Sequence, residues 1–250
     1  MTVWDNLSNE LDAWAATGKT AEFWWRDDDA IDATPALDRL LSLRRDLDVP
    51  LALAVIPANA RPMLAASLRG ESDIDILQHG YAHINHRPDG EKKAELRADR
   101  ELWDIARELA EGRGCMIRLF GDDGWQGVMV PPWNRIDPSF LPHLAKSGFR
   151  GLSTFKPRQQ LSAAPGVSQI NTHVDLMFWR PNPIFRGPSA CVADICTHLA
   201  AKRSGHADNT EPTGVLSHHN VMNIEAWDFL ADLFAATKNH PSCHWVIPAL

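Results

Sequence analysis

The chain has 250 residues, of which 44% are hydrophobic, and its formal net charge is −7. This length and hydrophobic content suffice for one large core, so we expect a single domain spanning residues 1–250. The acidic balance gives no electrostatic reason to bind nucleic acid or an anionic membrane. No apolar run approaches the roughly 18 residues of a membrane span.

The first sixteen residues mix acidic and apolar side chains. They lack the basic start and the continuous apolar stretch of a secretory signal. The four cysteines show neither C-x-x-C spacing nor the density of a disulfide scaffold,. We therefore expect a cytoplasmic protein with reduced, mostly buried thiols. The sequence indicates no particular oligomeric state.

Helix-like and strand-like patterns alternate along the chain,. The expected helices are 4–17, 35–47, 61–68, 89–110, 140–146, 189–202 and 225–237. The expected strands are 21–25, 51–56, 74–77, 116–120, 127–130, 151–155, 167–178, 213–216 and 245–247. The long helix 89–110 is expected to end at Gly112 and Gly114.

This alternation favours parallel strands joined by crossover helices, in an α/β barrel or a doubly wound sheet. Four polar clusters, 27–29, 79–86, 131–134 and 218–219, each follow a predicted strand. A closed barrel brings all its strand ends to one face, whereas an open sheet gathers mainly those at its switch point. The clusters therefore favour a (β/α) barrel.

Two of these clusters carry side chains suited to a metal ion. His79 and His83 are four residues apart, so in a helical turn they would share one face. The run Asp27-Asp28-Asp29 could supply a carboxylate and complete a site of two histidines and one carboxylate,. His86 could replace one of the ligands.

Four short motifs occur in a fixed order: Arg26-Asp27-Asp28-Asp29-Ala30, His79-Gly80-Tyr81-Ala82-His83, Pro131-Pro132-Trp133 and Leu216-Ser217-His218. From about Glu22 to about His219, this ordered set resembles the polysaccharide deacetylases, a carbohydrate esterase group. The resemblance implies a distorted (β/α) barrel like a TIM barrel, often with about seven parallel strands. It also implies metal-dependent hydrolysis of an N- or O-acetyl group.

Carried over residue by residue, the resemblance implies a metal bound by Asp29, His79 and His83, with Asp28 as general base and His218 as general acid. Pro132, Trp133 and the adjoining Asn134 would form one wall of the substrate groove. Zinc is the default metal for such ligands, although cobalt, nickel, manganese or iron could occupy the same site.

The chemistry of such a site follows from general principles. A divalent ion with three protein ligands keeps a position open for water and polarises a substrate carbonyl. Asp28 would take the proton of that water, and His218 would protonate the leaving amine or alkoxide.

Strand alternation leaves other assignments open. If the first strand continues through the aspartates, Asp28 and Asp29 point to opposite faces. Asp28 and Asp29 can both face the metal if the strand has already ended before them. If the strand continues, Asp27 and Asp29 share a face, and they would take the roles of general base and metal ligand. His219 could likewise replace His218.

The chain departs from the family pattern at three places. Ala30 stands where the first motif usually ends in glycine. Val130 stands where an arginine normally orients the base, and Arg26, Arg135 or Arg180 could take over that role. The fourth family motif is echoed only by residues 175–179, where Asp175 could orient His218.

The preferred hypothesis is a metal-dependent hydrolase of an amide or ester, most simply a deacetylase of a carbohydrate-like or small acylated molecule. The absence of a signal favours a soluble metabolite or sugar precursor over a cell-wall polysaccharide. A second hypothesis is another metal-assisted hydrolysis in the same barrel, favoured if cations suited to phosphate lie beside the metal. A third is a non-catalytic binding protein that retains the fold.

Overall fold

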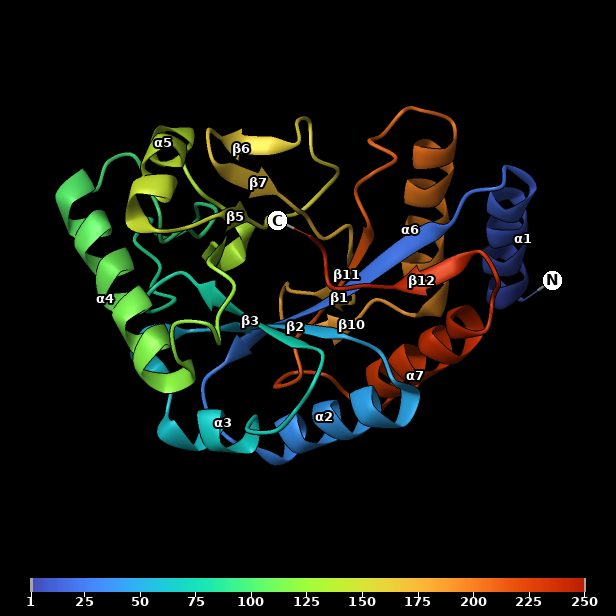
Figure 1. Ribbon diagram of the computed structural model, residues 1–250, viewed down its shortest axis with the longest axis horizontal. Helices are drawn as coiled ribbons and strands as arrows, with labels where there is room; N and C mark the ends of the chain where they lie inside the picture. The colour runs from blue at the N-terminus through green and yellow to red at the C-terminus, as the bar shows by residue number, and fades with distance from the viewer. Residues whose placement is uncertain (1, 250) are drawn as a thin grey trace.

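A curled, largely parallel sheet forms the centre of the computed structural model, which describes residues 2–249 (Figure 1). Its strand order is β6-β7-β5-β4-β3-β2-β1-β11-β8, and β12 pairs with the start of β1. The strands are β1 (Ala21–Ala30), β2 (Leu51–Val55), β3 (Ile74–His79), β4 (Val128–Val130), β5 (Gly151–Leu152), β6 (Ser162–Ala164), β7 (Val167–Gln169), β8 (Val174–Asp175), β11 (Thr213–Ser217) and β12 (Cys243–Trp245). A separate hairpin pairs β9 (Met177–Phe178) with β10 (Ile184–Phe185).

Helices surround this sheet (Figure 1). They are α1 (Val3–Ala16), α2 (Pro35–Leu47), α3 (Pro62–Ser67), α4 (Leu102–Phe120), α5 (Leu141–Leu144), α6 (Pro188–Arg203) and α7 (Ile224–Lys238). Their starts follow local rules: α2, for example, has Thr34 as N-cap, whose hydroxyl accepts from the Leu37 N–H, and proline at the first helical position,.

The sheet curls until its ends approach each other. Eight strands from β7 to β8 run parallel along the path, with only β6 antiparallel. Although β7 lies near one end and β8 at the other, only residues 170–173 separate them, and that stretch spans at most about 18 Å,. The predicted distorted (β/α) barrel is confirmed.

The two faces of the strands pack differently. Inward-facing apolar side chains form a small inner cluster of Trp24, Ala52, Ala54, Leu77, Val128, Val130 and Ile170. The outward-facing side chains join the helices in a much larger core. Because the interior is filled by side chains, a substrate has room only at the rims of the barrel.

The predicted helix 89–110 is wrong in its position. Residues 80–101 form a long loop, and α4 runs over Leu102–Phe120. The predicted strand 116–120 is therefore the last part of α4, whose buried positions Ile105, Leu109, Gly112 and Met116 follow helical spacing,. Gly112 does not end the helix; a Cβ there would lie 2.5 Å from the Gln78 amide nitrogen, so glycine permits close packing against β3,.

The strand candidates in the second half of the chain are shorter than predicted. Segment 151–155 contributes only the two residues of β5, and segment 167–178 is divided into β7, β8 and β9. The closing strand β12 begins at Cys243, two residues before its predicted start. Strands of two or three residues carry too few positions for a periodic pattern to define them.

Within residues 2–249, no helix combines the length and the apolar character needed to cross a membrane. All four cysteines have free thiols, with Cys191 and Cys243 buried and Cys115 and Cys196 partly buried.

Candidate active site

The site begins with a bulge in β1. Asp27 pairs with Leu53 and Ala30 with Val55, so two residues of β1 lie opposite one residue of β2,. Asp29, within the bulge, has a left-handed φ of 73°. The extra residue changes the alternation of the strand, so Asp28 and Asp29 both come close to His79 while β1 continues to Ala30. The strand therefore does not have to end for both carboxylates to reach one site.

Three ligand atoms converge above the end of β3. Asp29 Oδ1 lies 3.1 Å from His79 Nε2 and 3.4 Å from His83 Nε2. His79 Nδ1 lies 2.9 Å from the Val130 carbonyl oxygen, to which it donates when Nε2 is the free nitrogen. This contact fixes the ring with Nε2 toward Asp29, the usual arrangement of a metal-binding histidine.

The two histidines do not lie on a helical turn, as their spacing suggested. His79 is the last residue of β3, and the chain then turns sharply through Gly80 and His83, which both have φ of 57°. Glu95, buried in the long loop, accepts the N–H groups of Tyr81 and Ala82 at 3.1 and 2.9 Å. Glu95 thereby holds the turn that presents His83. No sequence motif singled out Glu95, because it acts on a turn far from its own position.

Asp28 is held by a buried arginine. Arg26 Nε and Nη2 lie 2.9 and 3.0 Å from the two carboxylate oxygens of Asp28, and both side chains are almost completely buried. The same guanidinium donates to Ser153 Oγ at 2.6 Å and to Asn134 Oδ1 at 2.6 Å. Arg26 therefore orients Asp28, a task for which Val130 is unsuited. Ser153 supports Arg26, and the sequence did not indicate it.

Trp133 and Asn134 form the rim of the site beside His83. Trp133 packs on the His83 ring, with centroids 4.3 Å apart. Both Trp133 and Asn134 have left-handed backbones, with φ of 56°. Asn tolerates this conformation better than most residues, but tryptophan adopts it at a cost. Pro132, directly before them, is buried.

His218 lies on the opposite side, immediately after β11. Trp179 meets its ring edge to face at a centroid distance of 4.5 Å. Asp175 does not hydrogen-bond to His218; its two carboxylate oxygens accept from the Met177 N–H and Trp179 Nε1, at 2.9 and 2.8 Å. Asp175 therefore acts on His218 through its charge and through the placement of Trp179.

Asp27, His219 and His86 lie outside this group. Asp27 accepts hydrogen bonds from Ser217 Oγ and from the backbone N–H of His219, and it pairs with the His219 ring. This buried network ties β1 to β11 on the outward face of the strand. His86 is exposed and does not join the ligand atoms of Asp29, His79 and His83.

The site's charges depend on one another. Burial raises the pKa of the Asp29 carboxyl, but the close contact with the His79 ring and the charges of His79, His218 and His83 outweigh it, so this pKa is lowered. The pKa of His79 is raised: burial acts to lower it, and Asp28 and Asp29 more than compensate. Asp29 is thus the ionised partner of two imidazoles.

The residues fit a divalent metal. Their ligand atoms lie within 4.8 Å of one another, and the buried Asp29 Oδ1 has no hydrogen bond of its own within residues 2–249. Two imidazoles and one carboxylate are a donor set that binds zinc and other divalent transition metals.

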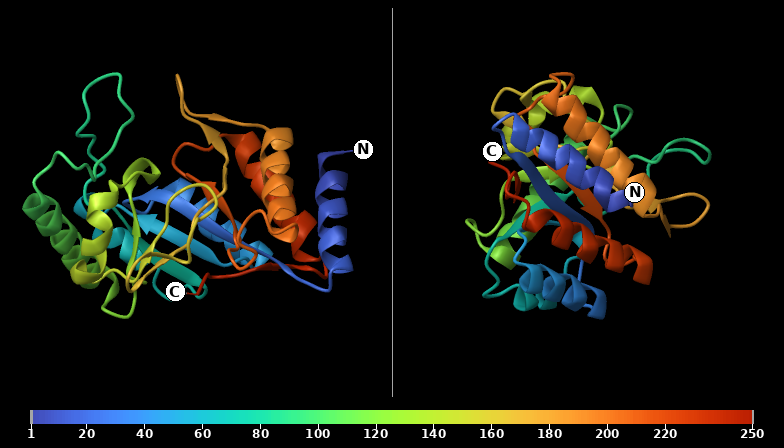
Figure 2. Two further views of the ribbon diagram at one scale, coloured as in Figure 1. Left: turned by 90° about the horizontal axis from the view of Figure 1, so that it is seen from above. Right: turned by 90° about the vertical axis from the view of Figure 1, so that its right-hand side faces the viewer.

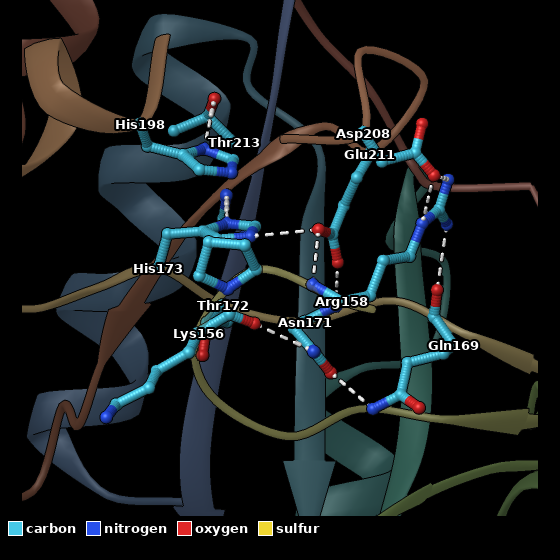
Figure 3. A network of polar contacts seen from close by, with 12 residues as sticks. Lys156, Arg158, Gln169, Asn171, Thr172, His173, His198, Asp208, Glu211 and Thr213 are labelled. Atoms are coloured by element: carbon cyan, nitrogen blue, oxygen red, sulfur yellow. Dashed lines mark hydrogen bonds and ion pairs between the residues drawn. The ribbon is translucent and has the colours of Figure 1, made fainter. Parts of the chain in front are cut away.

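A second group of metal-ligand residues, His173, His198 and Glu211, lies at the opposite rim of the barrel, before the starts of β8 and β11 (Figure 3). The rings of His173 and His198 stack with centroids 3.5 Å apart and planes 16° apart. Because an imidazole lone pair lies in the ring plane, two stacked rings cannot direct their nitrogens at one ion. Glu211 accepts the backbone N–H groups of Arg158 and Asn171. We interpret this group as a structural network.

Comparisons with known proteins agree with the fold. No protein-family model and no curated protein matches the sequence. Among solved structures, a family 4 carbohydrate esterase from Streptomyces lividans in complex with acetate matches with a TM-score of 0.58 at 11% identity, over 92% of this chain and 93% of that chain. A family 4 acetyl xylan esterase from Clostridium thermocellum, in complex with a cobalt ion, matches with a TM-score of 0.53 at 14% identity, over 90% and 87%.

A further match is a family 4 pseudoenzyme from Bacillus anthracis, with a TM-score of 0.56 at 13% identity, over 90% of this chain and 63% of that chain. At such low identities the similarity establishes the architecture and leaves activity to be argued from the site. The chain has the fold of the family 4 carbohydrate esterases, the fold implied by its motifs through their resemblance to polysaccharide deacetylases.

Proposed function

We propose that the protein is a metal-dependent deacylase that removes an acetyl or similar acyl group from a carbohydrate-like or small acylated substrate. The observation that carries this proposal is the convergence of Asp29 Oδ1 with His79 Nε2 and His83 Nε2. Asp28, held rigidly by Arg26, lies beside this triad. A ligand set of this kind next to a second, oriented carboxylate suits hydrolysis by activated water.

Each side chain has a defined task in this mechanism. Asp29, His79 and His83 would hold a divalent ion, which would polarise the acyl carbonyl and make a water molecule more acidic,. Asp28 accepts the proton of the attacking water, and the bidentate contact with Arg26 keeps its carboxylate oriented,. His218 donates a proton to the leaving amine or alkoxide, and Trp133 provides an apolar wall.

The buried Arg26–Asp28 pair favours a catalytic site over a binding site that has only kept the fold. Loss of the usual arginine at Val130 would leave the base unheld, but Arg26 holds it from within the same strand. A non-catalytic protein has no need of a buried, oriented carboxylate beside its metal ligands.

The first test is metal content, measured by elemental analysis after reconstitution with zinc. We expect about one ion per chain in the wild type and a loss of most of it in His79→Ala and Asp29→Ala. His86→Ala, which changes an exposed histidine in the same loop, is the matched control and should retain its metal.

Turnover of acetylated sugars and amides by the zinc-loaded protein then separates the hypotheses. Asp28→Asn should keep the metal and lose activity by on the order of 10²- to 10⁴-fold, the usual contribution of a general base. If the wild type binds no metal, or if both ligand variants retain it, the proposed ligands are wrong. A metal-loaded protein with no turnover on any acyl substrate would instead favour the binding-protein hypothesis.

A further inference from the structure

A cleft of about 410 Å³ opens beside the proposed active site. Its lining includes Arg87 from the long loop and Asn134, Arg135 and Asp137 from the segment after β4. Asn134 connects this cleft to the catalytic group, because its Oδ1 accepts from the guanidinium of Arg26 at 2.6 Å. The cleft and the group around Asp28 therefore share Asn134.

Three arginines gather at this place. Arg87 and Arg135 both line the cleft. Partial burial, and then the charges of Arg180 and Arg87, lower the pKa of Arg135, so Arg180 lies near the same place. Arg180 belongs to the β9–β10 hairpin, directly after the Trp179 that packs on His218. The hairpin and the loop 80–101 project from the same side of the molecule (Figure 2), so residues distant in sequence contribute to one cationic surface.

These charges are only partly balanced by the protein. Among residues 2–249, no carboxylate lies within 4.0 Å of Arg135 or Arg180, whereas Arg87 pairs with Glu91 at 2.9 Å. Arg135 donates to the Lys93 carbonyl. Asp137, the carboxylate of the cleft, accepts from the N–H and hydroxyl of Ser139.

This concentration of positive charge occurs in a chain whose formal net charge is −7. Three guanidinium groups close together repel one another, and a bound anion relieves that repulsion. Arginine also matches the geometry of phosphate and carboxylate, because its N–H groups can bind two oxygens at once.

We propose that the acylated substrate carries an oxyanion, phosphate or carboxylate, that binds Arg135 with Arg180 and Arg87. This inference rests on the proposed deacylase function and specifies its substrate class. It implies that the acyl group is removed from an anionic sugar or sugar-like metabolite, with the anionic group held in the cleft while the acyl carbonyl faces the metal ligands.

The experiment compares ligands with and without an acidic group by calorimetry on the zinc-loaded protein. Glucosamine is the probe without an acidic group, glucosamine 6-phosphate the phosphate probe and muramate the carboxylate probe; all three carry the same amine, so the acidic group is the difference that is tested. We expect at least one anionic probe to bind tenfold or more tightly than glucosamine, with the preference decreasing as salt is added. The probe that shows the preference identifies the anion.

The variant Arg135→Gln/Arg180→Gln should reduce that preference to less than threefold and leave glucosamine binding unchanged. Arg69→Gln, at an exposed arginine without an ion pair among the described residues, is the control and should match the wild type. The inference is wrong if the anions bind within threefold of glucosamine or not at all. It is also wrong if the double variant keeps the preference, since the anion would then bind elsewhere, for example to the metal.

Hydrolysis of the N-acetylated forms of the same probes separates this inference from the function on which it rests. An arginine-dependent preference without hydrolysis would support the anion site and contradict the deacylase. Hydrolysis with equal kcat/KM for neutral and anionic substrates would support the deacylase and contradict the anion site.

Discussion

Arg26 shows how one buried side chain can organise several parts of a site. Its guanidinium contacts Asp28 from its own strand, Ser153 from the segment after β5 and Asn134 from the rim. Arginine and aspartate are both costly to bury, so each depends on the other. Strand alternation places Trp24, Arg26 and Asp28 on the inward face of β1, which explains how the charge enters the barrel.

Replacing Arg26 should therefore separate its positioning of Asp28 from the effect of its positive charge. Arg26→Lys keeps a cation but loses the two-point contact, and we expect kcat to fall by on the order of 10²-fold with the zinc content unchanged. Arg26→Met leaves Asp28 buried without a partner and should cost about 3–5 kcal/mol in the free energy of unfolding.

Kinetics measures kcat, elemental analysis measures the zinc content, and urea unfolding measures the free energy of unfolding. Arg61→Lys, at an exposed arginine 3.7 Å from Asp32, is the control and should change stability by less than about 0.5 kcal/mol,. An Arg26→Lys enzyme with normal kcat would contradict the positioning role.

Several residues of the proposed site also share a left-handed backbone conformation. Among residues 2–249, seven residues other than glycine have positive φ, and Asp29, His83, Trp133 and Asn134 are four of them. The sequence located these positions because each follows a strand. It could not reveal their left-handed backbones, because asparagine, aspartate and histidine only favour that conformation and tryptophan gives no signal for it. Strain of this kind is common where a fold holds side chains for chemistry.

At the scale of secondary-structure elements, the sequence predicted the long strands and the regular helices. The strands β1, β2, β3 and β11 and the helices α1, α2, α6 and α7 lie within a few residues of their predicted bounds or, for β1, extend beyond them. Continuous apolar runs and clear amphipathic periods made this possible. Residues 89–101 of the loop were predicted as helix because their charged and apolar residues follow helical spacing, and only residues 102–110 of that prediction are helical.

The close contact between this loop and the segment after β4 leads to a prediction. A Cβ on Gly80 would lie 2.0 Å from Glu95 Oε2 and 2.5 Å from Pro132 Cδ, at a φ of +57°. Gly80→Ala should therefore displace the Glu95 carboxylate that holds the His83 turn. We expect a loss of about 1–3 kcal/mol in unfolding free energy and about tenfold weaker zinc binding.

Gly90→Ala is the matched control for this variant. Gly90 lies in the same loop with a φ of +88°, but nothing lies within 4 Å of its added Cβ. It should reproduce any cost of the left-handed backbone without weakening zinc binding. Equal zinc affinities for the two variants would show that the Gly80 contact does not support His83.

At the scale of the whole molecule, the two rims of the barrel have different tasks. The rim at the carboxyl ends of the strands carries the proposed active site, and the opposite rim carries the His173, His198 and Glu211 network (Figure 3). The sequence indicated the first rim because its polar residues follow strands in clusters. It gave no sign of the second, because its members are scattered from Arg158 to Thr213 and meet only when the barrel closes.

This network should make the folded protein sensitive to acid. Burial first, and then the nearby charges of His173 and Lys202, lower the pKa of His198 to about 2. The pKa of His173 is also lowered, mainly by burial, although Glu211 opposes the shift. In the unfolded chain a histidine has a pKa near 6.5, so the unfolded state binds more protons below that pH.

The contribution of this network to the free energy of unfolding should therefore be greatest above about pH 6.5 and fall as the pH decreases, with His198 contributing up to about 1.4 kcal/mol per pH unit. His198→Phe keeps the stacked shape, loses the contact with Thr213 Oγ1 and cannot be protonated. We expect it to be about 1 kcal/mol less stable at pH 7 but to lose much less stability between pH 6.5 and 4.5.

Urea unfolding across this pH range measures the effect. His244→Phe makes the same change at an exposed histidine of β12 and should retain the pH dependence of the wild type. Parallel curves for wild type and His198→Phe would show that acid acts elsewhere.

The position of Arg26 also affects how related sequences evolve and how a motif search identifies them. The proposed base, Asp28, and Arg26, which orients it, lie within three consecutive positions of one strand, so a single short stretch of gene encodes both. Position 130 is then released from selection for arginine. We expect homologues that combine an arginine two residues before the base with a small apolar residue at position 130 to be working enzymes, although a search that requires the usual arginine would classify them as degenerate.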